Sequence, residues 1–539
     1  MMKKIKLFRI SFLLPLLALA GCNEQDTDDL NRAFPLKSDT SANGTQIVLG
    51  QKYDNPYSVR NMVAAYSDLK NSGEQIGNIQ IRTTDLYVRF LPQDTAQYNS
   101  LEQDTNLVLF DYPLDYEIVQ EGDYYHDPSI PAGEYTWLYT TVPVGYQFDP
   151  TIHYEILDSC YIANNNTEGV ITDDDKLEQM SFRRLGLETT FMDPAELGAK
   201  GWFSGKKPQG TYNVYDNSIG AYVPIKGAQA VCHNIVKWGY SKLNANGHYS
   251  MNKKFHTKVY YKIKYKNEKG FMLRHPLTVS YDRFGFHNKG GYSKNIAAGD
   301  NRSWKLAVIN NSAYEYYDIC VQNKIQTPPE NLQIMLIDFM SGGAAPLISR
   351  VNQYISISPD PDQWWYKLLS SFDSDLAESI LNSSFVKKVF PDVIIGGKKY
   401  VPYASLYGLV CHELAHTSHF QQAGSNYWAD YISYIINNNG YGNKNCYNAG
   451  VCGVGEMWGF AMAAILTKEK YGIGYSGGYW FRWTTLADLI DQGYVTKKSV
   501  YDCLNQDVRT LEQFKEKLIE NNPSIAYHIE TAFLINLGI

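Results

Sequence analysis

Residues 409–420 read Leu409-Val410-Cys411-His412-Glu413-Leu414-Ala415-His416-Thr417-Ser418-His419-Phe420. On a helix, residues four apart lie one above the other on the same face, so His412 and His416 can direct two imidazoles at one metal ion. Glu413 lies beside them and can accept a proton from a water molecule held there. Glu413 is the only Asp, Glu, Lys or Arg in the stretch, and a carboxylate buried among apolar residues is costly without a partner. The stretch therefore predicts a buried helix with a metal site, and the competing interpretation is a buried polar cluster with a structural role alone.

A catalytic zinc site needs a third protein ligand besides the two histidines. Glu456 stands alone as a charged residue in Gly453-Val454-Gly455-Glu456-Met457-Trp458-Gly459-Phe460-Ala461-Met462-Ala463-Ala464, where glycines allow helices to approach closely. We expect Glu456 to be this ligand; the alternative is a glutamate near a helix N-terminus that faces solvent. His419 lies about 10 Å further along the helix axis than His412, at about 1.5 Å per residue. It is therefore expected outside the ligand set, in the second shell, in the cleft wall or at the surface.

This pattern of histidines and glutamates resembles the zincin metallopeptidases, and the glutamate on a later helix resembles their gluzincin branch. The resemblance covers about two hundred residues around the motif. It implies Zn²⁺ as cofactor, with His412, His416 and Glu456 as ligands. It also implies Glu413 as the catalytic base and a protein or peptide as substrate. The segment Leu332–Ile337 fits the edge strand above the zincin cleft, against which an extended substrate pairs.

Supporting groups of such a site cannot be ranked from the sequence. The candidates for a carboxylate that orients a metal-bound histidine are Asp430, Asp488 and Asp491. The candidate donors to a developing oxyanion are Tyr475, Tyr479 and Arg482. Cys411, which precedes the first histidine, is expected to be a small buried apolar residue rather than a nucleophile.

The N-terminus carries a targeting signal. Basic residues precede an apolar run at 10–20 that is too short to span a membrane. The run ends in Leu17-Ala18-Leu19-Ala20-Gly21-Cys22, which resembles a bacterial lipobox, so residues 1–21 are predicted to be a signal peptide and Cys22 to carry lipid. Residues 22–45 are predicted to include a flexible tether. Its acidic start resembles the export tag of Bacteroidota-type surface lipoproteins and implies an anchor in the outer membrane, exposed at the cell surface.

The rest of the chain is predicted to be multidomain. Residues 46–205 form an expected β-rich N-terminal domain, with a helix from Pro56 and strands at 86–91, 107–110 and 134–142. Residues 206–300 resemble the carboxypeptidase regulatory-like β-sandwich, an Ig-like module, with strands expected at 210–215, 223–231 and 258–265.

Residues 301–539 are predicted to form the catalytic domain, a mainly helical, zincin-like α+β unit. Besides the strand at 332–337, helices are expected at 304–325, within 362–390, and at 402–423, 427–436 and 455–470.

Composition limits the class of function. The chain has 539 residues and a net charge of −7, which argues against a nucleic-acid partner because such proteins usually present a basic face. Seven cysteines besides Cys22 leave at least one free thiol. Cys446 and Cys452 are the expected disulfide pair because they share a Gly/Asn-rich segment.

Two other functions stay open at this stage. The 43 tyrosines suit extracellular binding, although tyrosine also simply favours strands. The chain could therefore be a non-catalytic surface protein that binds a glycan or a host protein and keeps a relic zincin fold; the intact Glu413 argues against this. A protease that matures neighbouring surface proteins is the other alternative.

Overall fold

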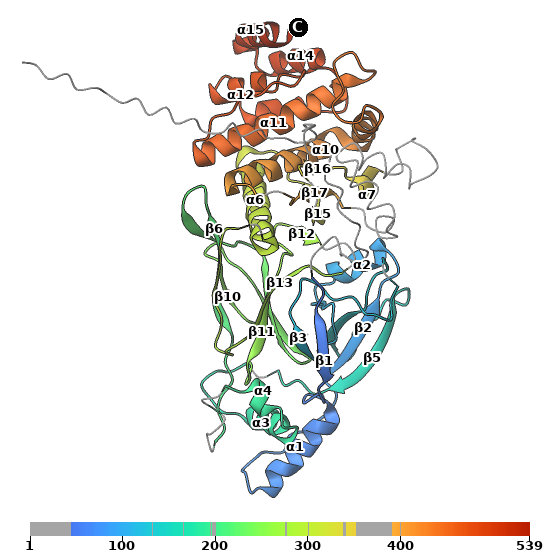
Figure 1. Ribbon diagram of the computed structural model, residues 1–539, viewed down its shortest axis with the longest axis vertical. Helices are drawn as coiled ribbons and strands as arrows, with labels where there is room; N and C mark the ends of the chain where they lie inside the picture. Colours follow the sequence, from blue (N-terminus) through green and yellow to red (C-terminus); the bar gives the residue numbers. More distant parts are fainter. Residues whose placement is uncertain are drawn as a thin grey trace, which may run out of the picture.

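The computed structural model describes residues 45–539 except 132, 165, 194–195, 197–200, 275–277, 300, 338–340, 352–390 and 399. It is a mixed α/β structure with several sheets and a helical C-terminal region, which confirms the predicted fold class at this coarse level. In Figure 1 the molecule is elongated, with the C-terminal helices at one end, the first helix at the other and the sheets between them. The predicted signal peptide, Cys22 and the helix within 362–390 lie outside the described residues.

The N-terminal part contains two small antiparallel sheets. Strand β1 (Val48–Lys52) pairs with β3 (Tyr116–Gln120), and the second sheet has the order β4 (Leu138–Pro143), β2 (Asp85–Leu91), β5 (His153–Cys160). The helices are α1 (Val59–Asn71), α2 (Thr95–Gln103), α3 (Asp173–Arg184) and α4 (Glu188–Phe191). The helix expected from Pro56 is α1, and it begins where Ser58 accepts a hydrogen bond from the amide of Asn61.

Two of the strands predicted in this part differ from the structure. Residues 107–110 make only an isolated bridge, Phe110 to Tyr139, so the strand predicted there is wrong. All four residues are buried, and a short apolar run fits a buried connection as well as a strand. The strand predicted at 134–142 begins only at Leu138.

The middle of the chain forms two four-stranded sheets. One contains β10 (His248–Ser250), β6 (Gln209–Asp216), β14 (Lys294–Ile296) and β7 (Ala221–Pro224); the other has the order β13 (Tyr281–His287), β11 (Val259–Lys264), β8 (Gln229–Asn234), β9 (Lys237–Lys242). The strands expected at 210–215 and 258–265 are confirmed as β6 and β11. The strand expected at 223–231 is instead split into β7 and β8 at Gly227, which has a φ of +69°.

The C-terminal sheet has the order β12 (Phe271–Arg274), β15 (Leu332–Ile337), β17 (Val393–Gly396), β16 (Gly343–Ala344). The first three strands are parallel, and β16 is antiparallel to β17 at the edge. The strand predicted at 332–337 is confirmed, but its placement at the edge is wrong, because β15 lies between two neighbours. All six of its residues are buried, and such a nearly continuous apolar run is typical of a central parallel strand.

Helices cover this sheet and complete the C-terminal region (Figure 1). They are α6 (Arg302–Asn323), α7 (Ile348–Val351), α10 (Tyr403–Asn437), α11 (Ala449–Tyr471), α12 (Thr484–Asp491), α13 (Lys497–Tyr501), α14 (Leu511–Asn521), the short 3₁₀ helix η3 (Pro523–Ile525) and α15 (Ala526–Leu537). The helices expected at 304–325, 402–423, 427–436 and 455–470 are present. By length and composition α11 could cross a membrane, but 94% of its apolar window is buried inside the protein, as in the core helix of a globular domain.

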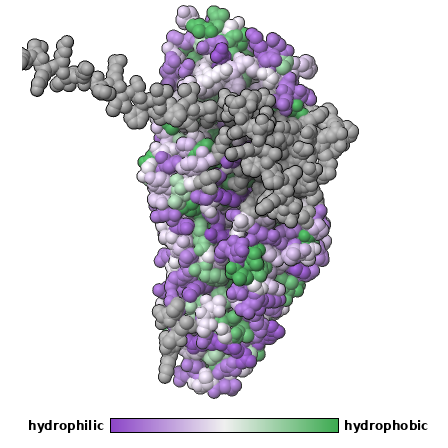
Figure 2. Space-filling view, viewed as in Figure 1, coloured by the Kyte–Doolittle hydropathy of each residue, from purple (hydrophilic) through white to green (hydrophobic). Residues whose placement is uncertain are grey.

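Two hydrophobic cores share the middle sheets. The larger core runs from β6 to α15, and the smaller one joins the N-terminal part to Val231, Trp238 and Tyr281. Outside these cores, hydrophilic and hydrophobic side chains are mixed across the face shown in Figure 2. The middle sheets therefore connect the N-terminal part to the helical region that holds the predicted site.

Candidate metal centre

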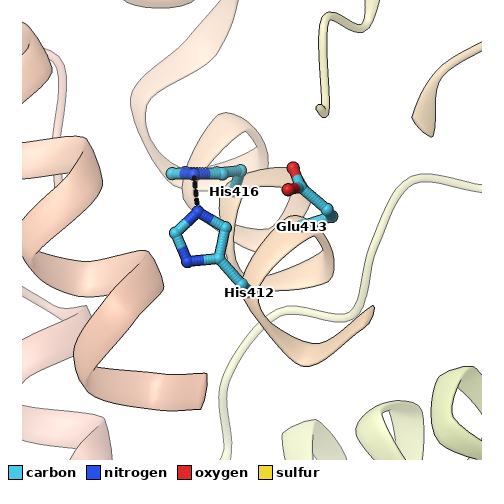
Figure 3. Close-up of side chains that lie close together, drawn as sticks. All are labelled: His412, Glu413 and His416. Carbon is cyan, nitrogen blue, oxygen red and sulfur yellow. Dashed lines mark hydrogen bonds between the residues drawn. The ribbon is translucent and has the colours of Figure 1, made fainter. Parts of the chain in front are cut away.

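Helix α10 carries the predicted motif and is broken once. Gly424 has a φ of 81° and a ψ of 174°, a conformation that only glycine adopts readily, so the helix changes direction there. The first half presents His412, Glu413 and His416 (Figure 3). The second half lines the same cavity with Tyr431, Ile432 and Ile435. Because of the break at Gly424, the two halves of α10 form two sides of the site.

Three predicted ligand groups meet at one point. His412 Nε2 lies 3.0 Å from His416 Nε2. Glu456, from α11, places Oε2 3.4 Å from His412 Nε2 and Oε1 3.6 Å from His416 Nε2. In a tetrahedral zinc site with bonds of about 2.0–2.2 Å, ligand atoms lie roughly 3.3–3.6 Å apart. The two distances to Glu456 match this spacing, and the two imidazole nitrogens, at 3.0 Å, would move apart by about 0.3 Å to hold one such ion.

The burial of Glu456 also favours a metal ion at this position. Glu456 is 1% exposed, and its Oε2 has no hydrogen bond of good geometry within the described residues, although His412 lies nearby. A buried carboxylate that is not fully compensated is costly. A cation between Glu456 and the two imidazoles would remove this cost, so the donor set fits a metal ion.

Burial sets the protonation of these groups. It lowers the pKa of His416 to about 3, so this imidazole is neutral and can offer its lone pair to a metal. Burial also lowers the pKa of His412, but the hydrogen bond to Glu456 and the charges of Glu413 and Glu456 outweigh it and raise that pKa above its ordinary value. Burial raises the pKa of Glu413 to about 8, with His412 opposing and Glu456 adding to the shift.

Backbone and hydroxyl groups, rather than the predicted carboxylates, support the ligands. The backbone of Gly459 hydrogen-bonds His412, and the Tyr431 hydroxyl donates to Glu456 Oε1. A Cβ atom at Gly459 would stand 2.9 Å from His416 Cε1 and 3.0 Å from His412 Cε1. The close packing of α11 on both imidazoles therefore needs glycine at this position.

The prediction that Asp430, Asp488 or Asp491 orients a histidine of the site is wrong, because each has another partner. Asp430 pairs with Arg509, Asp488 accepts from the Tyr475 hydroxyl, and Asp491 pairs with Lys468. All three pairs involve partly or fully exposed side chains. These aspartates therefore stay in contact with water and do not lie against the buried histidines.

Glu413 faces the edge strand. A Cβ atom at Gly343 in β16 would stand 2.7 Å from Glu413 Oε1, so a residue without a side chain lets the carboxylate occupy this place. The cavity between them has a volume of about 20 Å³, which is enough for one water molecule. It is lined by Gly343, Ala344, Ala345, Pro346, His412, Glu413, His416, Tyr431, Ile432, Ile435, Tyr441 and Glu456.

The predicted oxyanion donors do not line this cavity. Tyr475 borders a separate cavity, and Tyr479 stacks between Phe460 and Phe481. The tyrosines that do line it are Tyr431 and Tyr441. Because the chain has 43 tyrosines, being a tyrosine does not mark a residue as part of the site. The signal available for Tyr431 was its position one helical segment after the motif, beyond Gly424.

Cys411 and His419, which flank the motif, are both buried. Cys411 is buried and burial raises its thiol pKa, as expected for an apolar role. His419 is fully buried against Tyr427 and Trp428, so the surface position considered for it is wrong.

The expected disulfide between Cys446 and Cys452 is also wrong, because the two are not bonded to each other. Cys446 lies in the partly exposed segment before α11, close to Gly442. Cys452 is directed from the first turns of α11 into the core.

Comparisons with known proteins add little. No known family and no curated protein matches the sequence. Among solved structures, that of (S)-allantoin synthase matches 23% of this chain and 48% of its own, at 15% identity and a TM-score of 0.13. The chain thus aligns with about half of that protein, and a likeness this slight supports no inference.

Proposed function

We propose that this chain is a zinc-dependent metallopeptidase of the gluzincin type that hydrolyses peptide bonds in extracellular proteins. The observation that carries the proposal is the meeting of His412, His416 and Glu456 in a buried cavity beside Glu413. Two imidazole nitrogens and one carboxylate are the ligand set expected of a catalytic zinc site that keeps one position open.

Each residue then has a chemical role. Zn²⁺, when bound, supplies a Lewis acid that polarises a carbonyl and lowers the pKa of water. Glu413 accepts a proton from the attacking water and passes it to the leaving amine. Burial raises the pKa of Glu413, and a dication bound beside it would lower that pKa and keep the carboxylate charged. Tyr431 holds Glu456 in place through its hydroxyl group.

The edge strand β16 supports a peptide as the substrate. It is the last strand in the order of the described sheet, and it lies next to Glu413. An extended peptide can bind along an edge strand. This role belongs to β16 and not to β15, the strand that the sequence suggested.

The wider setting is part of the same proposal. We propose that the C-terminal region is zincin-like, that the two middle sheets form an Ig-like sandwich, and that lipid on Cys22 holds the protein at the outer membrane with its domains outside the cell. The lipobox and the acidic segment after it support this location, and the net charge of −7 supports a protein substrate over nucleic acid.

The test is metal content together with hydrolysis. We expect about one zinc per purified chain by plasma mass spectrometry, lost in His416→Ala and in Glu456→Ala. Glu413→Gln is the matched control, because it should keep the zinc and lose cleavage of a peptide library. A folded wild type without zinc would overturn the proposal. Zinc binding with no cleavage of any peptide would favour the non-catalytic alternative.

A further inference from the structure

The N-terminal part holds a second and larger cavity, with a volume of about 180 Å³. It lies between the C-terminal end of α2 and the segment that joins β4 to β5. It is lined by Phe90, Ser100, Leu101, Asp104, Tyr146, Gln147, Phe148, Asp149 and Ile152. Pockets for drug-sized ligands have volumes of about 300–1,000 Å³, so this one suits a single small ring.

The inner surface of this cavity is apolar and fixed. Phe90, Leu101 and Ile152 form its buried floor, each no more than 4% exposed. Phe148 forms a wall: one face stacks on Tyr154 with centroids 4.0 Å apart and planes at 10°, and Phe148 and Tyr146 meet edge to face at 5.0 Å and 82°. These contacts hold the Phe148 ring rigidly, so little ordering would be needed when a ligand packs against it.

The rim carries two oriented carboxylates. Asp104 accepts a hydrogen bond of 2.8 Å from the Tyr146 hydroxyl, and Asp149 accepts from the amide and hydroxyl of Thr151 at 2.8 and 2.7 Å. The bonds from Thr151 lower the pKa of Asp149, so this carboxylate is charged at neutral pH. Asp104 also accepts from the backbone and side-chain amides of Asn106 at 2.8 and 2.9 Å. A carboxylate has about four acceptor positions, so Asp104 keeps about one for a ligand and Asp149 about two.

The rim also carries donors. The amide group of Gln147 has two N–H bonds, of which one donates to Gly145 O at 2.9 Å, and Ser100 adds a hydroxyl group. A ligand that matches this rim must donate to Asp104 and Asp149 and accept from Gln147 and Ser100. An ammonium group can only donate, whereas a hydroxyl group does both.

We propose that this cavity binds one ring of a neutral saccharide. The apolar C–H face of the ring would pack on Phe148 and the buried floor, and its hydroxyl groups would reach the rim. Lys and Arg are absent from the residues that line the cavity, and two carboxylates are present. Anionic sugars and phosphates would therefore be repelled. The site is separate from the metal centre, and the proposal does not depend on peptidase activity.

The cavity is also connected to the C-terminal region. Asn99, on the same helix as Ser100 and Leu101, accepts a hydrogen bond of 2.7 Å from Gln333 in β15. In Figure 1, α2 accordingly lies at the end of the N-terminal part that is nearer to the C-terminal sheet. A saccharide held at α2 would thus lie on the part of the N-terminal domain that adjoins the catalytic region, and not at the far end of the molecule.

The test is ligand-observed NMR and calorimetry on the full purified chain. The probes are the methyl glycosides of glucose, galactose, mannose, N-acetylglucosamine and N-acetylgalactosamine, with glucuronic acid and Nα-acetyl-lysine amide for comparison. The variants are Phe148→Ala and Asp149→Ala; the latter changes an exposed side chain and should leave folding intact. Tyr222→Ala, an exposed tyrosine of β7, is the matched control.

We expect saturable binding of at least one neutral glycoside, weakened at least tenfold by Phe148→Ala and by Asp149→Ala and unchanged by Tyr222→Ala. Glucuronic acid should bind at least tenfold more weakly than the preferred neutral glycoside. Binding of the lysine probe alone would overturn the proposal in favour of a cation site. Absence of any binding to the folded wild type, or equal loss in all three variants, would also overturn it.

Discussion

Replacing Gly459 by alanine tests the metal centre through a residue that binds no metal itself. Gly459 lies in α11, three positions after Glu456, where the helix meets both imidazoles. Its missing Cβ is what lets His412 and His416 pack so closely, since that atom would stand 3.0 and 2.9 Å from their Cε1 atoms. Favourable contacts between carbon atoms begin at about 3.5 Å, so the imidazoles or the helix must move by about 0.5 Å or more.

The two consequences of this change differ in size. For stability, alanine is favoured over glycine in a helix by about 0.8–1 kcal/mol, and overpacking of a core costs about 1–3 kcal/mol, so the net loss should be at most about 2 kcal/mol. For metal binding, ligand distances must be kept to about 0.2 Å. A shift of about 0.5 Å exceeds this tolerance, and we expect zinc affinity to fall by about 100-fold or more.

The assay is competition with a zinc chelator, with thermal unfolding measured on the same samples. Gly455→Ala is the matched control, because it lies one turn earlier on α11 and its Cβ would meet the Tyr431 ring at 3.3 Å and His419 Nδ1 at 3.8 Å, with neither His412 nor His416 among its nearest atoms. It should bind zinc within a few-fold of wild type. Zinc affinity of Gly459→Ala equal to that of wild type would refute the argument, because the imidazoles would then not be packed as the structure has them.

Three further predictions concern other contacts. In Gly343→Ala the new Cβ displaces the Glu413 carboxylate from β16, so we expect peptide hydrolysis to fall at least tenfold with zinc content unchanged; loss of zinc would contradict this. Tyr431→Phe removes the hydroxyl group that holds Glu456, and we expect zinc affinity to fall by about 10–100-fold in the chelator assay, with wild-type affinity as the contrary result. Asp175→Asn breaks a buried ion pair with Lys254 and His256 and should lower the free energy of unfolding by about 3–5 kcal/mol at pH 7 in urea titrations. Although burial opposes the shift, these partners lower the pKa of Asp175 from 3.8 to about 2. The stabilisation is therefore complete above pH 4 and lost as the pH falls towards 2, so the difference between wild type and variant should shrink by about 2 kcal/mol over that range; parallel pH profiles would contradict the assignment.

The sequence predicted the parts of the site that depend on helical periodicity. His412 and His416 lie on one face because they are four residues apart on a helix, and Glu413 lies beside His412; both follow from the motif alone. Glu456 was found because it is the single charged residue in the apolar stretch 453–464 and such a carboxylate needs a partner. Both arguments are local, and the helices that they require, α10 and α11, are present.

The predictions that were wrong concern features that depend on how segments distant in the sequence pair. The motif gave no information on strand order, so β15 was placed at the edge that β16 occupies. A two-residue strand such as Gly343–Ala344 has no periodicity to detect. The supporting hydrogen bonds came from the backbone of Gly459 and from Tyr431, and neither residue type distinguishes itself in a chain with 41 glycines and 43 tyrosines.

Strand β12 has a consequence for any attempt to divide the chain. Residues Phe271–Arg274 lie within the range expected for the middle domain, yet they form the outer parallel neighbour of β15 in the C-terminal sheet. A fragment that begins at residue 301 would lack β12 and would expose the backbone edge of Leu332–Met335 that pairs with it. Such an edge is a template for pairing between molecules. The isolated C-terminal region should therefore aggregate on expression, whereas a fragment that retains β12 should stay in solution.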